Sequence, residues 1–242
     1  MKNNFFIFIV IVVLIILGFI LFLNKQPKCD SNQLAFKNNV AIISQEEDKK
    51  NIKIQYPQTE NQNINNLINL FTTQQITTFR QSLTQQVDNV VLEEKNSLWI
   101  SYISSQFSSQ IRSYTFTISQ YILGMAHPNN FIITKTYDFD NNKEIILEDL
   151  FNDTNYLEKI SAISFEKLKL QLPEIEETMI KKGTKAIANN FQNFALTENS
   201  LIIHFSSYQV APYVNGSQKV EINFFEIKEI LKKQYQDRVL SN

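Results

Sequence analysis

The feature that most constrains this chain is an uninterrupted apolar run from Phe5 to Leu23, which contains no polar side chain. A helix that crosses a bilayer needs about 20 consecutive apolar residues. Each Leu, Ile, Val or Phe at depth favours insertion by roughly 0.3–0.6 kcal/mol, so the run as a whole favours it clearly. We therefore predict a single transmembrane helix at residues 5–23, preceded by a stub at residues 1–4.

Two other interpretations of this run stay open. A cleaved signal peptide has an apolar region of about 7–15 residues and small residues at its cleavage site, and Asn24–Lys28 offers no such site. A lipoprotein signal needs small residues before its cysteine, whereas Cys29 follows Gln, Pro and Lys. Lysines lie on both sides of the run, so the distribution of positive charge does not orient the helix.

The composition of the whole chain suits a folded domain better than a disordered tail. Hydrophobic residues make up 43% and charged residues 19%, and the chain has only 4 glycines and 5 prolines, so long flexible linkers are not expected. The formal net charge of −1 gives no basic stripe for nucleic acid. A single cysteine excludes an intrachain disulfide, so packing alone must hold the core.

Hydrophobic periodicity predicts an α+β fold in which an antiparallel sheet packs with helices. Apolar residues from Ile64 to Val87 recur at three-or-four spacing, which predicts an amphipathic helix. A second helix is expected from Leu157 to Leu168 for the same reason. Alternation of apolar and polar residues predicts strands, arranged largely as an antiparallel meander, at 52–56, 98–102, 114–118, 131–139, 201–205 and 220–222.

Local signals mark two further helices. Pro173 is expected to open a helix that Gly183 closes, because proline is tolerated in a first helical turn. Asn223 and Glu226 have the spacing of a capping pair, which predicts a last helix whose apolar stripe reaches Leu231.

The predicted organisation has three parts after the transmembrane helix. Residues 24–50 are polar and are expected to be a spacer, with a short strand at 40–43. A strand-helix-strand module is expected at 51–123, and a C-terminal α+β module of the same ectodomain at 124–242.

Six segments stand out along the second half of the chain: Gly124–Pro128, Thr136–Asp140, Ile145–Phe151, Asn193–Thr197, Leu201–Phe205 and Tyr208–Gly216. Taken in this order, they resemble the RsiV/PdaC-like extracytoplasmic domain of unknown function. That domain occurs in a lysozyme-sensing anti-sigma factor and N-terminal to the catalytic domain of a peptidoglycan deacetylase. The resemblance covers roughly residues 50–235.

The resemblance implies a domain outside the cytoplasmic membrane, anchored by the single-pass helix, with residues 1–4 in the cytoplasm. It implies a non-catalytic binding or sensing role without metal or cofactor. The expected partners are the cytoplasmic membrane and a cell-wall glycan or a lysozyme-like protein. A pure scaffold that meets its partner through the transmembrane helix stays as another interpretation.

An envelope hydrolase is the alternative function. It would use His127 with Asp138 or Asp140, because a histidine paired with a carboxylate is a common general base. A metal site there would need three or four converging ligands, so we expect none. Glu148 and Asp149 are adjacent in sequence, which suits a turn better than acid–base chemistry across one bond.

The most promising ligand-binding residues lie in a proline-containing stretch rich in tyrosine. Aromatic rings beside an amide and a stiffened turn can stack on a sugar ring or pack against a protein. The competing interpretation is that the two tyrosines are core residues and that the glycine merely permits a turn. The candidates are Tyr208, Pro212, Tyr213, Asn215 and Gly216, with Val210 considered beside them, together with His127.

Overall fold

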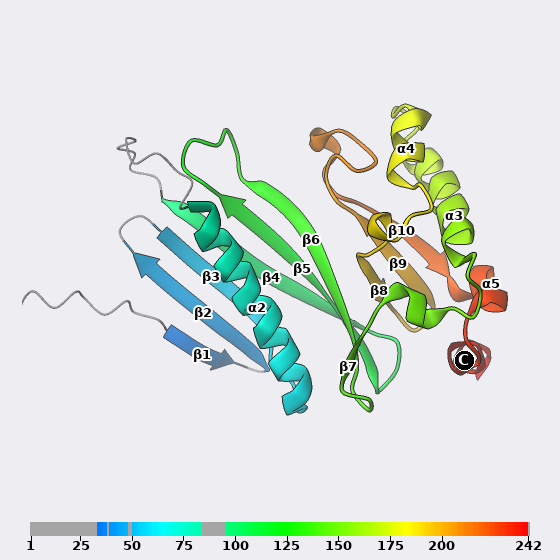
Figure 1. The fold of residues 1–242 in the computed structure, drawn as a ribbon, viewed down its shortest axis with the longest axis horizontal. Helices are drawn as coiled ribbons and strands as arrows, with labels where there is room; N and C mark the ends of the chain where they lie inside the picture. Colours follow the sequence, from blue (N-terminus) through cyan, green and yellow to red (C-terminus); the bar gives the residue numbers. More distant parts are fainter. Residues whose placement is uncertain (1–32, 38, 48–49, 84–94, 242) are drawn as a thin grey trace, which may run out of the picture.

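Figure 1 shows two β-sheets with helices on their outer sides. The computed structural model describes residues 33–37, 39–47, 50–83 and 95–241. The predicted transmembrane helix at 5–23 and Cys29 lie outside these residues. Within the described part of the chain, no helix is long and apolar enough to cross a membrane.

The first sheet has seven strands in the order in which they occur along the chain. Every neighbouring pair is antiparallel except β3 and β4, which are parallel and are connected through helix α2, Gln62–Leu83. The strands are β1 (Gln33–Lys37), β2 (Val40–Glu47), β3 (Lys50–Pro57), β4 (Asn96–Gln106), β5 (Ile111–Tyr121), β6 (Asn129–Asp138) and β7 (Lys143–Ile145).

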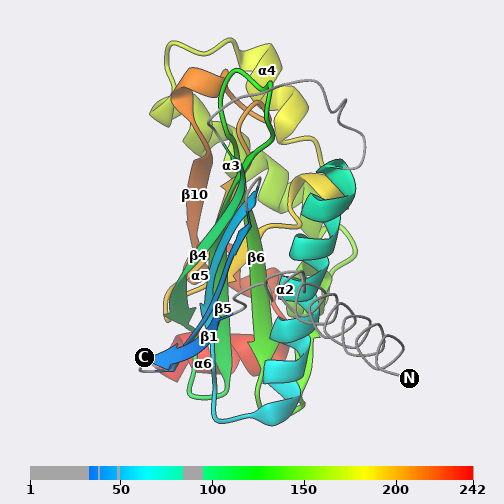
Figure 2. The same ribbon diagram turned by 90° about the vertical axis from the view of Figure 1, so that its left-hand side faces the viewer.

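Helix α2 covers one face of the first sheet (Figure 2). Its buried residues include Ile64, Ile68 and Phe71, which follow the predicted helical spacing. They pack against alternate residues of the strands, such as Leu98 and Phe116. The apolar residues that recur every three or four positions on the helix and at every second position on the strands therefore pack into one core, as the sequence predicted.

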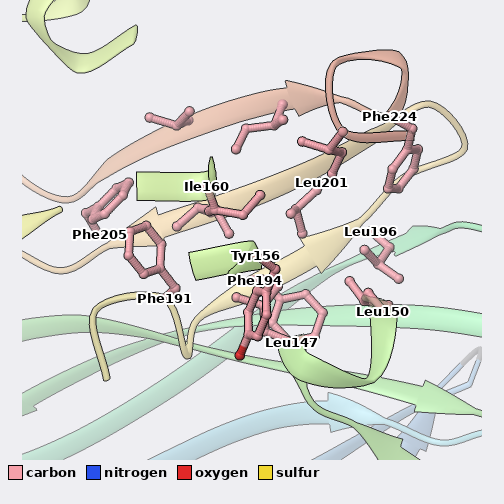
Figure 3. Close-up of a cluster of buried hydrophobic side chains, with 14 of the residues drawn as sticks. Leu147, Leu150, Tyr156, Ile160, Phe191, Phe194, Leu196, Leu201, Phe205 and Phe224 are labelled. Atoms are coloured by element: carbon pink, nitrogen blue, oxygen red, sulfur yellow. The ribbon is translucent and has the colours of Figure 1, made fainter. Parts of the chain in front are cut away.

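The second sheet has three antiparallel strands, β8 (Phe194–Leu196), β9 (Ser200–Phe205) and β10 (Gln218–Asn223). Helices α3 (Tyr156–Gln171) and α4 (Glu177–Gly183) lie on its outer side (Figure 1). Side chains from α3, from the short helix η1 (Leu147–Leu150) and from β8 and β9 form a second hydrophobic core (Figure 3).

The two sheets are joined through β8, which lies across the face of the first sheet that α2 leaves open. The Ser113 hydroxyl accepts a hydrogen bond from the backbone N–H of Leu196 at 2.8 Å, and the Ser105 hydroxyl donates to the Leu196 carbonyl at 2.8 Å. A third link runs from the Thr134 N–H to Asn193 Oδ1 at 3.2 Å. The α+β fold class is thus confirmed, with two sheets in place of one.

The predicted spacer and the predicted module boundary both need correction. The short strand predicted at 40–43 is confirmed as the start of β2, but β2 continues to Glu47, and residues 33–37 of the predicted spacer form β1 at the edge of the first sheet. Edge strands expose one side to water, so polar residues are compatible with a strand there. The boundary at 123/124 falls between β5 and β6, which pair along their whole length.

Two helix predictions near the C-terminus also changed. Pro173 does not open α4, because that helix starts only at Glu177. The capping pair is confirmed, since Asn223 Oδ1 accepts from the Phe225 N–H and Glu226 Oε1 accepts from the Asn223 N–H. The helix that follows, α5, is short (Phe224–Ile227) and continues as a 3₁₀ turn, η4, Lys228–Ile230, before α6, Lys233–Ser241.

Candidate ligand-binding site

Two connections that are far apart in the sequence meet at one end of the molecule. The first links β5 to β6 and contains His127, and the second links β9 to β10 and contains Tyr208 and Tyr213. Both lie at the upper end in Figures 1 and 2. The structure thereby brings together residues that the sequence singled out in two separate motifs.

The meeting point is a stack of three aromatic rings. The His127 and Tyr213 rings lie 4.4 Å apart between centroids at an angle of 26°, and Tyr208 and Tyr213 lie 5.4 Å apart at 31°. Tyr208 is 63% exposed and His127 is also exposed, whereas Tyr213 is half-buried between them. The interpretation of these tyrosines as core residues is therefore wrong, and the stack faces water.

Hydrogen bonds fix Tyr213 to the first sheet. Its hydroxyl donates to the Pro128 carbonyl at 3.1 Å, and Asn130 Nδ2 lies 3.5 Å from the same hydroxyl. The His127 Nδ1 is 3.0 Å from the Pro128 carbonyl. Tyr213, the central ring of the stack, is thus held by the β5–β6 connection, which also contains His127.

The backbone at Tyr208 is strained. Its φ of +69° lies in the left-handed region, which costs a residue other than glycine roughly 1–2 kcal/mol. Such strain persists only where the surrounding structure fixes it, and it concentrates at functional sites. At Tyr208 the strained backbone directs a large aromatic side chain into water, so little free energy from burial of the ring offsets the strain.

Gln209, Val210 and Ala211 hold the strained segment in place. Gln209 Nε2 donates to the carbonyls of Gly183 at 3.1 Å and Asn190 at 3.0 Å. Val210 and Ala211 are completely or almost completely buried in the second core. Val210 was considered a surface residue from the sequence, but it is a core residue. Val210 and Ala211 face the core, whereas Tyr208 before them and Pro212 after them face the solvent.

The other predicted site residues surround the stack without joining it. Pro212 is exposed and precedes the 3₁₀ helix η3, Tyr213–Asn215. Asn215 Nδ2 donates to Glu174 Oε1 at 3.2 Å, and Gly216 adopts a φ of +67° as the turn ends. The interpretation of Gly216 as a turn residue fits its conformation.

The predicted pairing of His127 with Asp138 or Asp140 is wrong. His127 precedes the start of β6, Asp138 is the last residue of that strand, and Asp140 lies beyond it. Ten residues of strand separate the two ends by roughly 30 Å. Asp138 instead forms the turn after β6, where its carboxylate accepts from the backbone N–H groups of Asp140 and Asn141.

The other carboxylates considered from the sequence also have local roles. Asp149 Oδ2 accepts from the backbone N–H of Ile146 at 3.1 Å, which stabilises the turn of η1. Among the described residues, no group of three or more His, Cys, Asp and Glu side chains is placed to hold a metal ion.

The second histidine, His204 on β9, is buried. Its removal from water, together with the positive charge of Lys219, lowers the pKa of its imidazole to about 4. Lys219 is its direct cross-strand partner on β10. His204 is therefore neutral at physiological pH.

Sequence reasoning missed a pocket of about 380 Å³ beside the edge of β6. It includes the Lys135–Glu144 ion pair at 2.8 Å and the buried Thr134, whose hydroxyl has no hydrogen-bond partner. Residues from five separate stretches of the chain, between 133 and 194, form it, so no local pattern could have revealed it. Its lining includes Thr136, Ile146, Tyr156, Gln192 and Phe194.

Part of the chain matches a known protein family, and most of it aligns with a characterised protein. Residues 148–224 match the family described as "Protein of unknown function (DUF3298)". The peptidoglycan-N-acetylmuramic acid deacetylase PdaC of Bacillus subtilis is 30% identical over 204 residues, which are 83% of this chain and 43% of the deacetylase. The match therefore spans less than half the length of that relative.

Two solved structures have a similar fold. A DUF3298 family member from Bacteroides fragilis has a TM-score of 0.58 at 14% identity and covers 88% of this chain and 100% of its own. A DUF3298 family protein from Pseudomonas aeruginosa has a TM-score of 0.57 at 12% identity, covering 86% of this chain and 94% of its own. The resemblance found in the sequence is confirmed: this chain contains a DUF3298 domain, of unknown function, over residues 148–224.

Proposed function

We propose that this chain is a non-catalytic binding domain at the outer face of the cytoplasmic membrane and that it recognises a cell-wall glycan. The observation that carries the proposal is the exposed stack of His127, Tyr213 and Tyr208. Two distant connections build it, and Tyr208 joins it although its backbone has a strained, positive φ. The similarity to a peptidoglycan deacetylase supports a wall glycan as the ligand class.

The chemistry of the stack suits a sugar. A pyranose ring has an apolar face of C–H groups and a rim of hydroxyl groups. Tyrosine matches both, because its ring is apolar and its hydroxyl needs a hydrogen-bond partner. The Tyr213 hydroxyl and the Asn130 amide lie next to one another at the edge of the stack and can bond the rim.

Sedimentation with purified, insoluble peptidoglycan tests this proposal, using the full chain in mild detergent. We expect saturable co-sedimentation and a loss of about tenfold in affinity for Tyr213→Ala. Phe225→Ala is the matched control, because Phe225 is 60% exposed and lies on α5, away from the stack. Absence of binding to peptidoglycan would refute the glycan as ligand.

Immobilised lysozyme serves as a separate bait in the same experiment. The family resemblance includes a lysozyme-sensing protein, and aromatic residues are common at the centres of protein interfaces. Saturable binding to lysozyme that Tyr213→Ala abolishes, without binding to peptidoglycan, would assign the same stack to a protein ligand instead.

Membrane anchoring through residues 5–23 is the second part of the proposal. The support is the length and apolarity of that run. We expect the expressed chain to stay in the membrane pellet after alkaline carbonate washing, and protease added outside the cell to digest its C-terminal part. Release of the intact chain by the wash would contradict the anchor.

A further inference from the structure

The face of the first sheet that α2 leaves open contains an exposed tryptophan. Leu98 and Ile100 point towards α2 and are buried, so Trp99 between them points to the opposite face. Trp99 is 54% exposed and is the only tryptophan of the chain. Aromatic residues, tryptophan among them, are enriched in binding surfaces relative to the rest of a protein surface.

The strand register connects Trp99 to the aromatic stack. Trp99 pairs directly with Ser119 on β5, and Ser119 pairs with Asn130 on β6. Directly paired residues of neighbouring strands place their side chains on the same face. Asn130 Nδ2 in turn lies 3.5 Å from the Tyr213 hydroxyl. Trp99, Ser119, Asn130 and Tyr213 thus form one continuous line, which we call the cross-strand row.

The row is longer than one sugar ring. Neighbouring strands lie about 4.8 Å apart, so the backbones of Trp99 and Asn130 are separated by roughly 10 Å. Aromatic rings stand at the two ends, and a hydroxyl and an amide lie between them. On the far side of Trp99, Lys53 of β3 is its partner in the register and adds an ammonium group.

A hollow accompanies the row where the two sheets approach each other. It has a volume of about 430 Å³, and its lining includes Ile132, His204, Gln218 and Lys219. Ile132 follows Asn130 on the same face of β6. A chain that lies along the row therefore has the first sheet beneath it and the second sheet at one side.

We propose that the ligand is an extended glycan chain of about three rings or more, which lies across the strands from the aromatic stack to Trp99. This inference rests on the proposed function, because it defines the length and direction of the ligand that the stack binds. Alternating aromatic and polar groups match a polymer whose rings each present an apolar face and a hydroxyl rim. The row contains no carboxylate, and Lys53 at its end suits a glycan that bears acidic substituents.

A length series of oligosaccharides tests the inference on the full chain in mild detergent. The probes are the disaccharide, tetrasaccharide and hexasaccharide of β-1,4-linked N-acetylglucosamine, with muramidase-released peptidoglycan fragments as an acidic set. Because Trp99 is the only tryptophan, its fluorescence reports on this end of the row directly. We expect the tetrasaccharide and hexasaccharide, but not the disaccharide, to change its emission saturably.

Calorimetry on variants separates the two ends of the row. Trp99→Ala should lower the affinity for the hexasaccharide about tenfold, equivalent to about 1.4 kcal/mol, and leave that for the disaccharide unchanged. Trp99→Phe keeps a ring and should restore most of the affinity. Tyr213→Ala should weaken both probes, and Phe225→Ala neither. Circular dichroism of each variant checks that it is folded.

The outcomes distinguish the inference from the proposed function. If all probes bind with equal affinity and Trp99→Ala changes none of them, the stack binds sugar and the extended row is refuted. If neither the oligosaccharides nor peptidoglycan bind, the proposed function and the inference fall together. A dependence on chain length that disappears in Trp99→Ala supports the extended ligand.

Discussion

Gly183→Ala is expected to destabilise the chain and to displace the segment that carries the two tyrosines. Gly183 is the last residue of α4, and a Cβ atom there would lie 2.0 Å from the Gln209 carbonyl oxygen and 2.7 Å from Val210 Cγ1. Non-bonded heavy atoms attract one another best near 3.5–4.0 Å, so α4 and this segment must separate by roughly 1 Å or more.

The magnitude follows from two opposing effects. Overpacking costs about 1–3 kcal/mol, and the upper end applies here because the nearest clashing atom belongs to the backbone. Replacing glycine by alanine in a helix returns about 0.5–1 kcal/mol. The net loss is therefore about 2 kcal/mol, which corresponds to a decrease in Tm of about 4–8 °C for a domain of this size.

Thermal unfolding followed by circular dichroism measures this effect. The control is Lys182→Ala, which removes an exposed side chain from the preceding residue of α4 and should leave the Tm unchanged. Peptidoglycan sedimentation on the same samples should show weaker binding for Gly183→Ala, because Gln209 anchors the segment between Tyr208 and Tyr213. A Tm within about 1 °C of wild type would refute the packing argument, and a lowered Tm with unchanged binding would separate the segment from the ligand.

Two further predictions address His204 and Tyr208. The folded-state pKa of His204, about 4, lies below its usual 6.5, so the unfolded chain binds the proton more readily. Stability should fall by up to about 3 kcal/mol as the pH decreases from 7 to 4. Urea unfolding at several pH values measures this fall. If the free energy of unfolding depended on pH as steeply in His204→Gln as in the wild type, His204 would not be its cause. Tyr208→Gly should alter stability by less than about 1 kcal/mol, because relief of the positive φ offsets the lost ring contact. The same variant should weaken peptidoglycan binding severalfold, and unchanged binding would remove Tyr208 from the site.

Local chemistry made much of the fold predictable. The spacing of Ile64, Ile68 and Phe71 marks α2, and the alternation around Phe116 marks β5, because each element buries one side against the same core. The capping pair at Asn223 acts over three residues and was visible for the same reason.

Features that depend on distant partners were not predictable. The strand β1 and the second half of β2 lie in a segment polar enough to resemble a spacer, and only the pairing of β1 with β2 and of β2 with β3 shows their full extent. The role of Gly183 depends on the backbone of Gln209, which comes from another part of the chain. The prediction that joined His127 to Asp138 failed because closeness in sequence was taken for closeness in space, whereas an extended strand separates its ends.

The candidate site spans both sheets, which bears on how tightly it can bind. Trp99 and Asn130 belong to the first sheet, whereas Tyr213 belongs to the connection of the second. A ligand that bridges two parts loses affinity if the parts move independently, because binding must then order them. Here the Leu196 backbone bonds to Ser105 and Ser113, so the sheets are fixed to each other before any ligand arrives.

Ser113→Ala removes one of these bonds and leaves the buried Leu196 N–H without a partner. We therefore expect Ser113→Ala to weaken the binding of glycans of any length that contact the stack, because the stack itself joins a connection of each sheet.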